Sequence, residues 1–360
     1  MNVLVTGGCG YIGSHLVIEL LSEGFDVVVL DDLSTGQFDA LARAELVAGR
    51  ACRLVRGSVC DPAAVYEALD GVEVVCHLAA HKNVAASGRH PGRYFSNNVG
   101  GMSVLLEQME RRGTRRIINS SSAAVYGTRA VMPLQEDAPL KPDSPYGVTK
   151  LIGEQMLQQM AEHHDWSAVS LRYFNPAGAH PSGFIGEPMR NADSLVARAL
   201  RALLDPSRPL TIYGSDYDTA DGTCRRDFIH VADLTRAHRI AMSALKRPGH
   251  HVYNVGTGRS HSVREIVAEC GAAAGRPVPQ REGTRRPGDI PVAVADVGRF
   301  RSEHGFVARR GLCEMVSSAW DWASRAHTDR IGIRGSPDIE SARLRAHAAL
   351  GPHWSLGLTA

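Results

Sequence analysis

The chain has 360 residues, of which 44% are apolar and 22% charged, an ordinary composition for a globular protein with one large or two unequal domains. Its 40 Lys and Arg residues nearly balance its 38 Asp and Glu residues, which gives no reason to expect a nucleic acid or an acidic membrane as a partner. Any specificity is therefore expected to reside in a pocket.

The seven cysteines are scattered without a C-x-x-C pair, so neither a zinc site nor a disulfide framework is predicted. The sequence runs from Met1 directly into an apolar strand pattern, without the charged and apolar segments of a secretory signal. No stretch approaches the roughly eighteen consecutive apolar residues of a membrane-spanning helix. We therefore expect no metal centre, no membrane span and a cytoplasmic location.

Short apolar, β-branched runs alternate with helix-length segments through the first half of the chain. Strands are predicted at residues 2–5, 26–30, 52–55, 72–78, 115–119 and 167–171. Strands that alternate with helices favour a parallel sheet covered on both faces. The predicted fold class is therefore α/β, with a doubly wound parallel sheet.

After about residue 175, Gly- and Pro-rich loops separate isolated helices and short strands, which indicates a smaller α/β lobe. We predict a first domain over residues 1–175, to which the chain returns near 227–258, and a second lobe over 176–327. Residues 328–360 form a tail with a helix-like middle at 339–349, and no role is assigned to it.

A glycine-rich loop follows the first predicted strand, with Gly8, Gly10 and Gly13 in the G-x-G-x-x-G spacing. Glycines allow a tight turn, and the N-terminus of the next helix offers N–H groups to a pyrophosphate. The second strand ends at Asp31, where an acid accepts from the ribose of NAD. The alternative is a plain strand–helix turn whose acid caps the next segment.

Tyr146 and Lys150 stand four positions apart in "SPYGVTK". Ser144 is a typical helix cap and Pro145 a typical first helical residue, so a helix is predicted to begin here. On one helix face, the ammonium would lower the pKa of the phenol from about 10 by stabilising the phenolate. From these seven residues alone, the alternative is an ordinary surface pair.

The stretch "INSSSAAVYG" ends the strand predicted at 115–119, at the edge where open α/β sheets bind their ligands. Ser122 would lie there beside the tyrosine and hydrogen-bond a substrate hydroxyl. A polar strand end is the alternative interpretation.

Taken together, "TGGCGYIG", "SSSAAVYG" and "YGVTK" resemble the extended short-chain dehydrogenase/reductase family. In the second lobe, residues 171–183, 210–234, 253–258 and 285–291 are similar in order and spacing to the UDP-galactose 4-epimerase (UDP-glucose 4-epimerase) family. The resemblance covers roughly residues 1–325. It implies a Rossmann-type NAD-binding domain, a UDP-sugar substrate and a homodimer formed through helices near 91–112 and 146–163.

By this resemblance, catalysis falls to Ser122, Tyr146 and Lys150. The implied NAD-binding residues are Gly7, Gly10, Tyr11, Ile12, Gly13, Asp31, Asp32, Ser58, Val59, Leu78, Ala79, Ala80, Lys82, Asn98, Ser120, Tyr146, Lys150 and Tyr173. The implied UDP-sugar-binding residues are Lys82, Ser122, Tyr146, Asn175, Ser194, Leu195, Tyr213, Arg226, Val263, Arg286, Asp289 and Ala293.

The implied reaction is epimerisation at C4 of a UDP-hexose. Tyr146, as phenolate, would take the proton of the 4-hydroxyl while the C4 hydride moves to NAD, and Ser122 would orient the oxygen. Return of the hydride to the opposite face of the ketose inverts C4 and regenerates NAD, which stays bound. Arg226 and Arg286 suit the diphosphate, because a guanidinium pairs two oxygens at once.

Three departures from the family bear on the substrate. Ser58 replaces a usual aspartate near the adenine, and the stretch 187–195 that leads to Ser194 and Leu195 is shortened. Ala293 stands where some members carry tyrosine, so an N-acetylhexosamine would find room; the alternative is that Ala293 only packs. A specialised sugar therefore remains an alternative to UDP-glucose and UDP-galactose.

Other activities on the same fold are open alternatives. A 4,6-dehydratase needs an acid and a base directly after the Ser122 position, where this chain has Ala123 and Ala124. Decarboxylation of UDP-sugars and epimerisation of uronates are distinguished by testing UDP-glucuronate. A non-catalytic NAD sensor has no need of the tyrosine and lysine at catalytic spacing.

Overall fold

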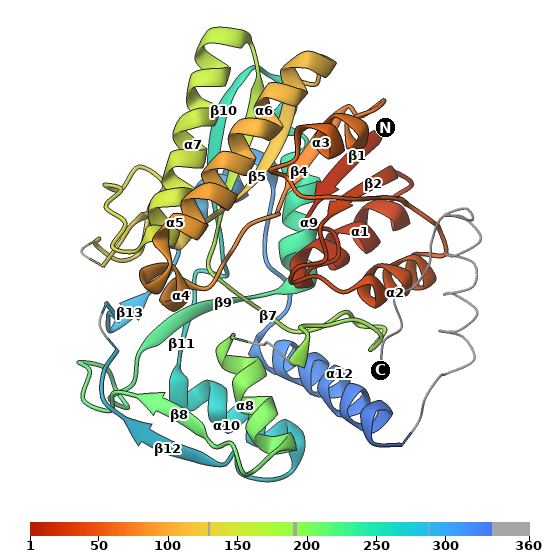
Figure 1. Cartoon of the computed structure of the whole chain (residues 1–360). Coiled ribbons are helices and arrows are strands. Elements are labelled where there is room, and N and C mark those ends of the chain that lie inside the picture. Colours follow the sequence, from red (N-terminus) through yellow and green to blue (C-terminus); the bar gives the residue numbers. More distant parts are fainter. Residues whose placement is uncertain (129, 190–192, 287, 333–360) are drawn as a thin grey trace.

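The computed structural model describes residues 1–128, 130–189, 193–286 and 288–332 (Figure 1). Seven parallel strands form the central sheet in the order β10-β6-β5-β4-β1-β2-β3. They are β1 (Asn2–Thr6), β2 (Asp26–Asp31), β3 (Arg53–Arg56), β4 (Val74–His77), β5 (Arg116–Ser122), β6 (Ser167–Tyr173) and β10 (Gly249–Val255). The predicted Rossmann-type parallel sheet is confirmed, and each of the six predicted strands lies in it.

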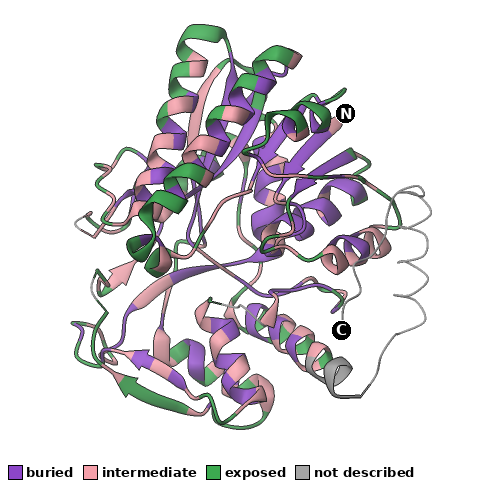
Figure 2. Cartoon of the chain, viewed as in Figure 1, coloured by how far each residue is buried: buried purple, intermediate pink, exposed green. Residues whose placement is uncertain are grey.

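Both faces of this sheet are buried, as the continuous apolar runs require. In β1, Val3 and Val5 lie in one hydrophobic core and Leu4 lies in the other, because successive strand side chains point to opposite faces. The purple strands of Figure 2 show this burial.

Helices cover the two faces of the sheet. One face is covered by α1 (Tyr11–Ser22), α2 (Phe38–Ala48), α9 (Val231–Ala241) and α11 (Gly298–His304). The other is covered by α3 (Pro62–Ala68), α6 (Gly101–Arg112) and α7 (Pro145–His164). The short α4 (Val84–Arg89), α5 (Pro91–Tyr94) and the π-helical η1 (Phe95–Gly100) contact α7.

A second lobe lies below the sheet in Figure 1. One of its sheets has the order β11-β9-β13, with β7 also paired to β9, and the other pairs β8 with β12. Its strands are β7 (Asn175–Ala177), β8 (Leu210–Tyr213), β9 (Arg225–His230), β11 (Ser260–Ser262), β12 (Gln280–Gly283) and β13 (Val292–Ala293). Its helices are α8 (Leu195–Leu204), α10 (Val263–Ala274) and α12 (Leu312–Gly332), which share one apolar core.

The chain passes between the two lobes more than once. From β9 in the second lobe it continues directly into α9, which packs on α1, and then into β10 at the edge of the central sheet. Two 3-10 turns, η2 (Ala123–Val125) and η4 (Ala244–Lys246), complete the described elements. The domain boundaries drawn from the sequence stay a prediction.

Within the described residues, no helix has the length and apolar character needed to cross a membrane. The helix-like stretch predicted at 339–349 lies outside the described residues.

Candidate active site

The glycine-rich loop connects β1 to α1 at the carboxyl edge of the sheet. Gly7 has a φ of 73°, and a Cβ on it would lie 2.9 Å from the backbone nitrogen of Ala79. A Cβ on Gly13 would lie 2.1 Å from the carbonyl oxygen of Gly7. Gly10 caps α1 without a side-chain acceptor. Only glycine fits this close approach. Because no side chain caps α1, the N–H groups at its N-terminus are left for an anionic ligand such as a dinucleotide pyrophosphate.

The first two residues of α1 pack inward. The hydroxyl of Tyr11 donates to the carbonyl oxygen of Gly178 in the second lobe, at 2.6 Å. Ile12 packs against the core between the sheet and α1. Tyr11 therefore connects the start of α1 to the opposite lobe.

Asp31 lies beside this loop, at the end of β2. Its two carboxylate oxygens accept hydrogen bonds from the backbone N–H groups of Cys9 at 2.9 Å and Leu33 at 2.8 Å. Burial raises the pKa of Asp31, and the two hydrogen bonds oppose that rise. Asp32 is exposed and accepts from the backbone of Ser34. Asp31 thus orders the loop, and its contact with a ribose stays a prediction.

The loop after β4 is fixed by Asn98. The Asn98 side chain accepts from the backbone N–H of His81 at 2.8 Å and donates to its carbonyl oxygen at 3.0 Å. Its amide also donates to the Thr149 hydroxyl on α7, at 3.1 Å. Other residues predicted to bind NAD follow β3 or β4 at the same carboxyl edge: Ser58, Val59, Leu78, Ala79, Ala80 and Lys82.

Ser122, Tyr146 and Lys150 come together where β5 ends and α7 begins. Ser144 accepts a hydrogen bond from the Gly147 N–H at 3.1 Å, and Pro145 starts the helix, so the predicted helix start is confirmed. The Nζ of Lys150 lies 5.9 Å from the ring centroid of Tyr146. It also donates to the carbonyl oxygen of Ser120 at 2.5 Å. Two adjacent elements therefore hold the three groups.

The electrostatics of this cluster differ from the prediction. Burial raises the pKa of Tyr146 to about 12, against an opposing hydrogen bond with Ser122. Burial lowers the pKa of Lys150 to about 8, and the nearby Glu154 carboxylate opposes that shift. The net shift in the pKa of Tyr146 is therefore upward, opposite to the direction expected from Lys150, because the loss of hydration dominates.

Tyr173 ends β6 next to this cluster. Its hydroxyl is hydrogen-bonded to Nε2 of His238 on α9, and burial raises its pKa, against a hydrogen bond with Ser120. The phenol is therefore engaged within the chain, and its contact with a cofactor stays a prediction.

Tyr213, Arg226, Arg286 and Asp289 form a second cluster, in the second lobe. The Asp289 carboxylate lies between the arginines, with Oδ1 3.3 Å from Nη2 of Arg226 and Oδ2 3.2 Å from Nε of Arg286. The guanidinium carbon of Arg286 lies 4.6 Å from the Tyr213 ring centroid. Ala293 pairs with Arg226 across β13 and β9. Two cations thus share one acid beside an aromatic ring, which suits a nucleoside diphosphate.

The remaining predicted substrate residues lie at the starts of elements in the same lobe. The Asn175 amide donates to the backbone carbonyl of Asp227 at 2.7 Å. Leu195 and Val263 begin α8 and α10 and pack against the apolar core. These contacts are structural, and the substrate contacts of the three residues stay predictions.

Glu187 links Ser194 and Lys82. Ser194 caps α8 and donates to Oε2 of Glu187 at 2.5 Å. The Nζ of Lys82 lies 3.9 Å from Oε1 of the same carboxylate, so this acid connects the two lobes. Among the described residues, no three His, Cys, Asp or Glu side chains group so as to hold a metal ion.

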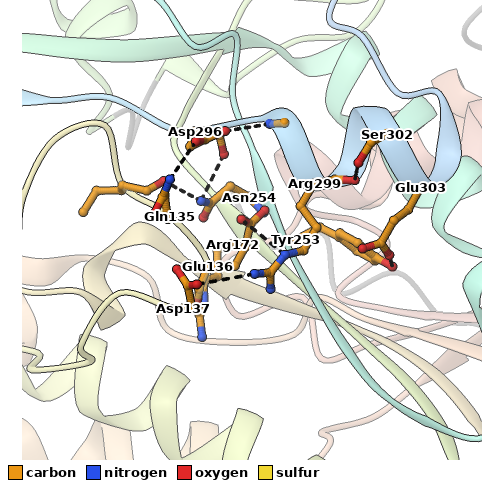
Figure 3. Close-up of polar contacts among 12 residues, drawn as sticks. Gln135, Glu136, Asp137, Arg172, Tyr253, Asn254, Asp296, Arg299, Ser302 and Glu303 are labelled. Carbon is orange, nitrogen blue, oxygen red and sulfur yellow. Dashed lines mark hydrogen bonds and ion pairs between the residues drawn. The ribbon is translucent and has the colours of Figure 1, made fainter.

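Sequence reasoning missed an ion pair next to the cluster of Ser122, Tyr146 and Lys150. Glu154, four residues after Lys150 on α7, pairs with Arg172 of β6 at 2.7 Å and accepts from Ser121 at 2.5 Å. Arg172 continues into the polar network of Figure 3, where it donates to the carbonyl oxygen of Glu136 at 2.8 Å. The helical spacing from Lys150 was a signal for Glu154, but no local pattern indicated its pairing with Arg172.

Sequence reasoning also missed Arg198, on the first turns of α8. Its guanidinium carbon lies 5.7 Å from the Tyr213 ring centroid, so it belongs to the second cluster. Arg198 stands four residues after the predicted substrate residue Ser194, and residues at this helical spacing share one face, so the spacing was the available signal.

Comparison with known proteins defines the family. Residues 3–256 match the NAD dependent epimerase/dehydratase family. The chain belongs to this family. A UDP-glucose 4-epimerase of Bacillus subtilis is 42% identical over 329 residues, which are 90% of this chain and 97% of that protein. The predicted family resemblance is therefore confirmed.

Solved structures of this family have the same fold as the chain. The UDP-glucose 4-epimerase of Bifidobacterium longum, crystallised with NAD+ and UDP, superposes with a TM-score of 0.86 at 38% identity and covers 90% of this chain and 98% of its own. The UDP-Glc/GlcNAc 4-epimerase of Campylobacter jejuni superposes with a TM-score of 0.78 at 33% identity and covers 90% and 99%.

Proposed function

We propose that this protein is an NAD-dependent 4-epimerase that interconverts UDP-hexoses. The observation that carries the proposal is the convergence of Ser122, Tyr146 and Lys150 at the carboxyl edge of the sheet, beside a loop that only glycine can form. The arginine cluster around Asp289 supplies the cations that a UDP diphosphate requires.

The residues at the sheet edge fit NAD. The α1 N-terminus and the glycine-rich loop would hold its pyrophosphate, Asp31 would face a ribose, and Lys150 would lie near the other ribose. When bound, NAD supplies the acceptor for the hydride of C4 and the donor that returns it.

The chain's own residues manage the proton of the 4-hydroxyl. The Tyr146 phenolate accepts that proton as the C4 hydride leaves, so a 4-ketone forms, and the phenol gives the proton back when C4 is reduced. Ser122, which lies close enough to the phenol to lower its pKa, would orient the sugar oxygen. Lys150 is the chain's own cation on the same helix face and offsets part of the cost of burying the phenolate.

The sugar must turn over between the two hydride transfers so that the opposite face is reduced. Arg226 and Arg286 would hold the diphosphate through this rotation, because the nucleotide is the part of the substrate that keeps its contacts. Ala293 pairs with Arg226 in the strand register, and its small side chain would leave room for an acetamido group. Both UDP-hexoses and their N-acetyl equivalents are therefore proposed substrates.

Incubation with a panel of UDP-sugars tests the proposal. We expect UDP-galactose and UDP-glucose to interconvert, with product stereochemistry identified by NMR. Accumulation of a stable 4-keto sugar would reassign the chain as a dehydratase, and turnover of UDP-glucuronate alone would reassign it to uronates. Bound NAD without hydride exchange on any UDP-sugar would reject catalysis.

We also propose that the enzyme works in the cytoplasm as a homodimer formed through α6 and α7. All seven cysteines are free, which suits a reducing compartment. Phe95, in the η1 segment that contacts α7, has 37% of its surface exposed, as an apolar interface residue would in one subunit. Light scattering on Phe95→Glu tests the dimer; an unchanged mass would place the interface elsewhere.

A further inference from the structure

Three guanidinium groups, not two, gather around the second-lobe cluster. The Tyr213 ring is approached by Arg198 of α8 at 5.7 Å and by Arg286 at 4.6 Å, measured from guanidinium carbon to ring centroid. Arg286 shares Asp289 with Arg226. A helix, a strand and a loop far apart in the sequence therefore direct cationic groups to one place.

The cluster carries an excess of positive charge. Asp289 is the single acid shared by Arg226 and Arg286, while Arg198 forms no ion pair with any acid in the described part of the chain. Three guanidinium groups and one carboxylate leave a net charge of +2.

Two acids that lie close in sequence to the cluster are already paired with arginines outside it. Asp216 is paired with Arg285 at 2.7 Å, and Glu282 is paired with Arg264 at 2.6 Å. Each of these pairs is neutral by itself. The excess charge around Tyr213 therefore calls for an anionic partner from outside the chain.

We propose that Arg198 is a third arginine that binds the diphosphate of the nucleotide sugar. The proposal rests on the function proposed above, because it takes UDP as the bound group. The two phosphates each carry one negative charge, which matches the excess of the cluster. A guanidinium above an aromatic face is held in position while its N–H groups stay available, whereas a carboxylate partner would occupy them.

Binding of UDP and of uridine to the full-length protein tests this role, because the two ligands differ only in the diphosphate. We compare wild type with Arg198→Ala, with Arg198→Lys and with Arg201→Ala, which removes the same charge from the same helix outside the cluster. Calorimetry gives the Kd of UDP, and an NMR titration gives that of uridine. Thermal melting identifies variants that fold.

Arg198→Ala should raise the Kd of UDP about tenfold, equivalent to about 1.4 kcal/mol, and leave the Kd of uridine unchanged. The Kd of UDP for Arg198→Lys should lie between those of wild type and Arg198→Ala, since lysine keeps the charge but not the planar guanidinium. The Kd for Arg201→Ala should match that of wild type. The loss of affinity for UDP in Arg198→Ala should be smaller at high salt concentration. An unchanged Kd of UDP, or equal losses for UDP and uridine, would overturn the role. A wild type that binds no UDP would reject the proposed function itself.

Discussion

Arg172 and Glu154 form a buried, two-pronged ion pair one helical turn after Lys150 on α7. Nε of Arg172 donates to Oε1 of Glu154 at 3.0 Å and Nη2 donates to Oε2 at 2.7 Å, with both side chains at most 5% exposed. The pair joins α7 to β6. Arg172 also donates to the Tyr126 hydroxyl and to the backbone carbonyl oxygen of Glu136, which is labelled in Figure 3. The helix that carries Tyr146 and Lys150 is therefore anchored to the sheet.

Glu154→Gln should destabilise the fold by about 3 kcal/mol, because it leaves a buried guanidinium without its counter-charge. Urea unfolding measures the change in the free energy of unfolding. The control is Asp70→Asn, which breaks the exposed pair of Asp70 with Arg112 and should cost less than about 1 kcal/mol. Equal losses in the two variants would show that burial does not govern the Arg172 pair.

Tyr146→Phe should lower kcat at least about a hundredfold, because it removes the group that accepts and returns the proton of the 4-hydroxyl. The amount of copurified NAD should be unchanged. Coupled assays of UDP-galactose turnover measure the loss, and Tyr66→Phe, on the exposed surface of α3, serves as the control. More than a tenth of wild-type activity in Tyr146→Phe would rule out this tyrosine as the base.

Local patterns were sufficient to predict the central sheet and the start of α7. Apolar runs without polar alternation placed the strands, and "SPYG" placed Ser144 as the cap. The approach of Arg198 to Tyr213 and the pairing of Arg172 with Glu154 depend on packing between distant segments. The environment of Tyr146 also depends on such packing, and the loss of hydration there raises its pKa, opposite to the expected direction. The site residues implied by the family resemblance stay predictions.

The stability of the protein should rise with pH through the titration of Lys150. Burial lowers the pKa of Lys150 from 10.5 to about 8, so between these values the unfolded chain binds more protons than the folded one. The free energy of unfolding of wild type, relative to Lys150→Met, should therefore increase by about 2 kcal/mol from pH 7.5 to 9.5.

Urea unfolding of both proteins across this range measures that difference, since all other titrating groups are shared. Lys246→Met, at an exposed lysine of η4, should run parallel to wild type. A Lys150→Met curve that also runs parallel to wild type would show that Lys150 titrates normally in the folded protein.

Ala293→Tyr should reduce the range of UDP-sugars that the enzyme accepts as substrates. Ala293 pairs with Arg226 in the strand register, so a tyrosine there would fill space next to the proposed diphosphate and sugar site. We expect kcat/KM for UDP-N-acetylglucosamine to fall about tenfold or more, and kcat/KM for UDP-glucose to change by less than about threefold, since each lost or blocked apolar contact is worth about 1–3 kcal/mol. Val292→Tyr, at the adjacent position of β13, is the matched control, because neighbouring strand residues face opposite sides. Equal losses for both sugars would mean that Ala293 acts through packing and does not select the C2 substituent.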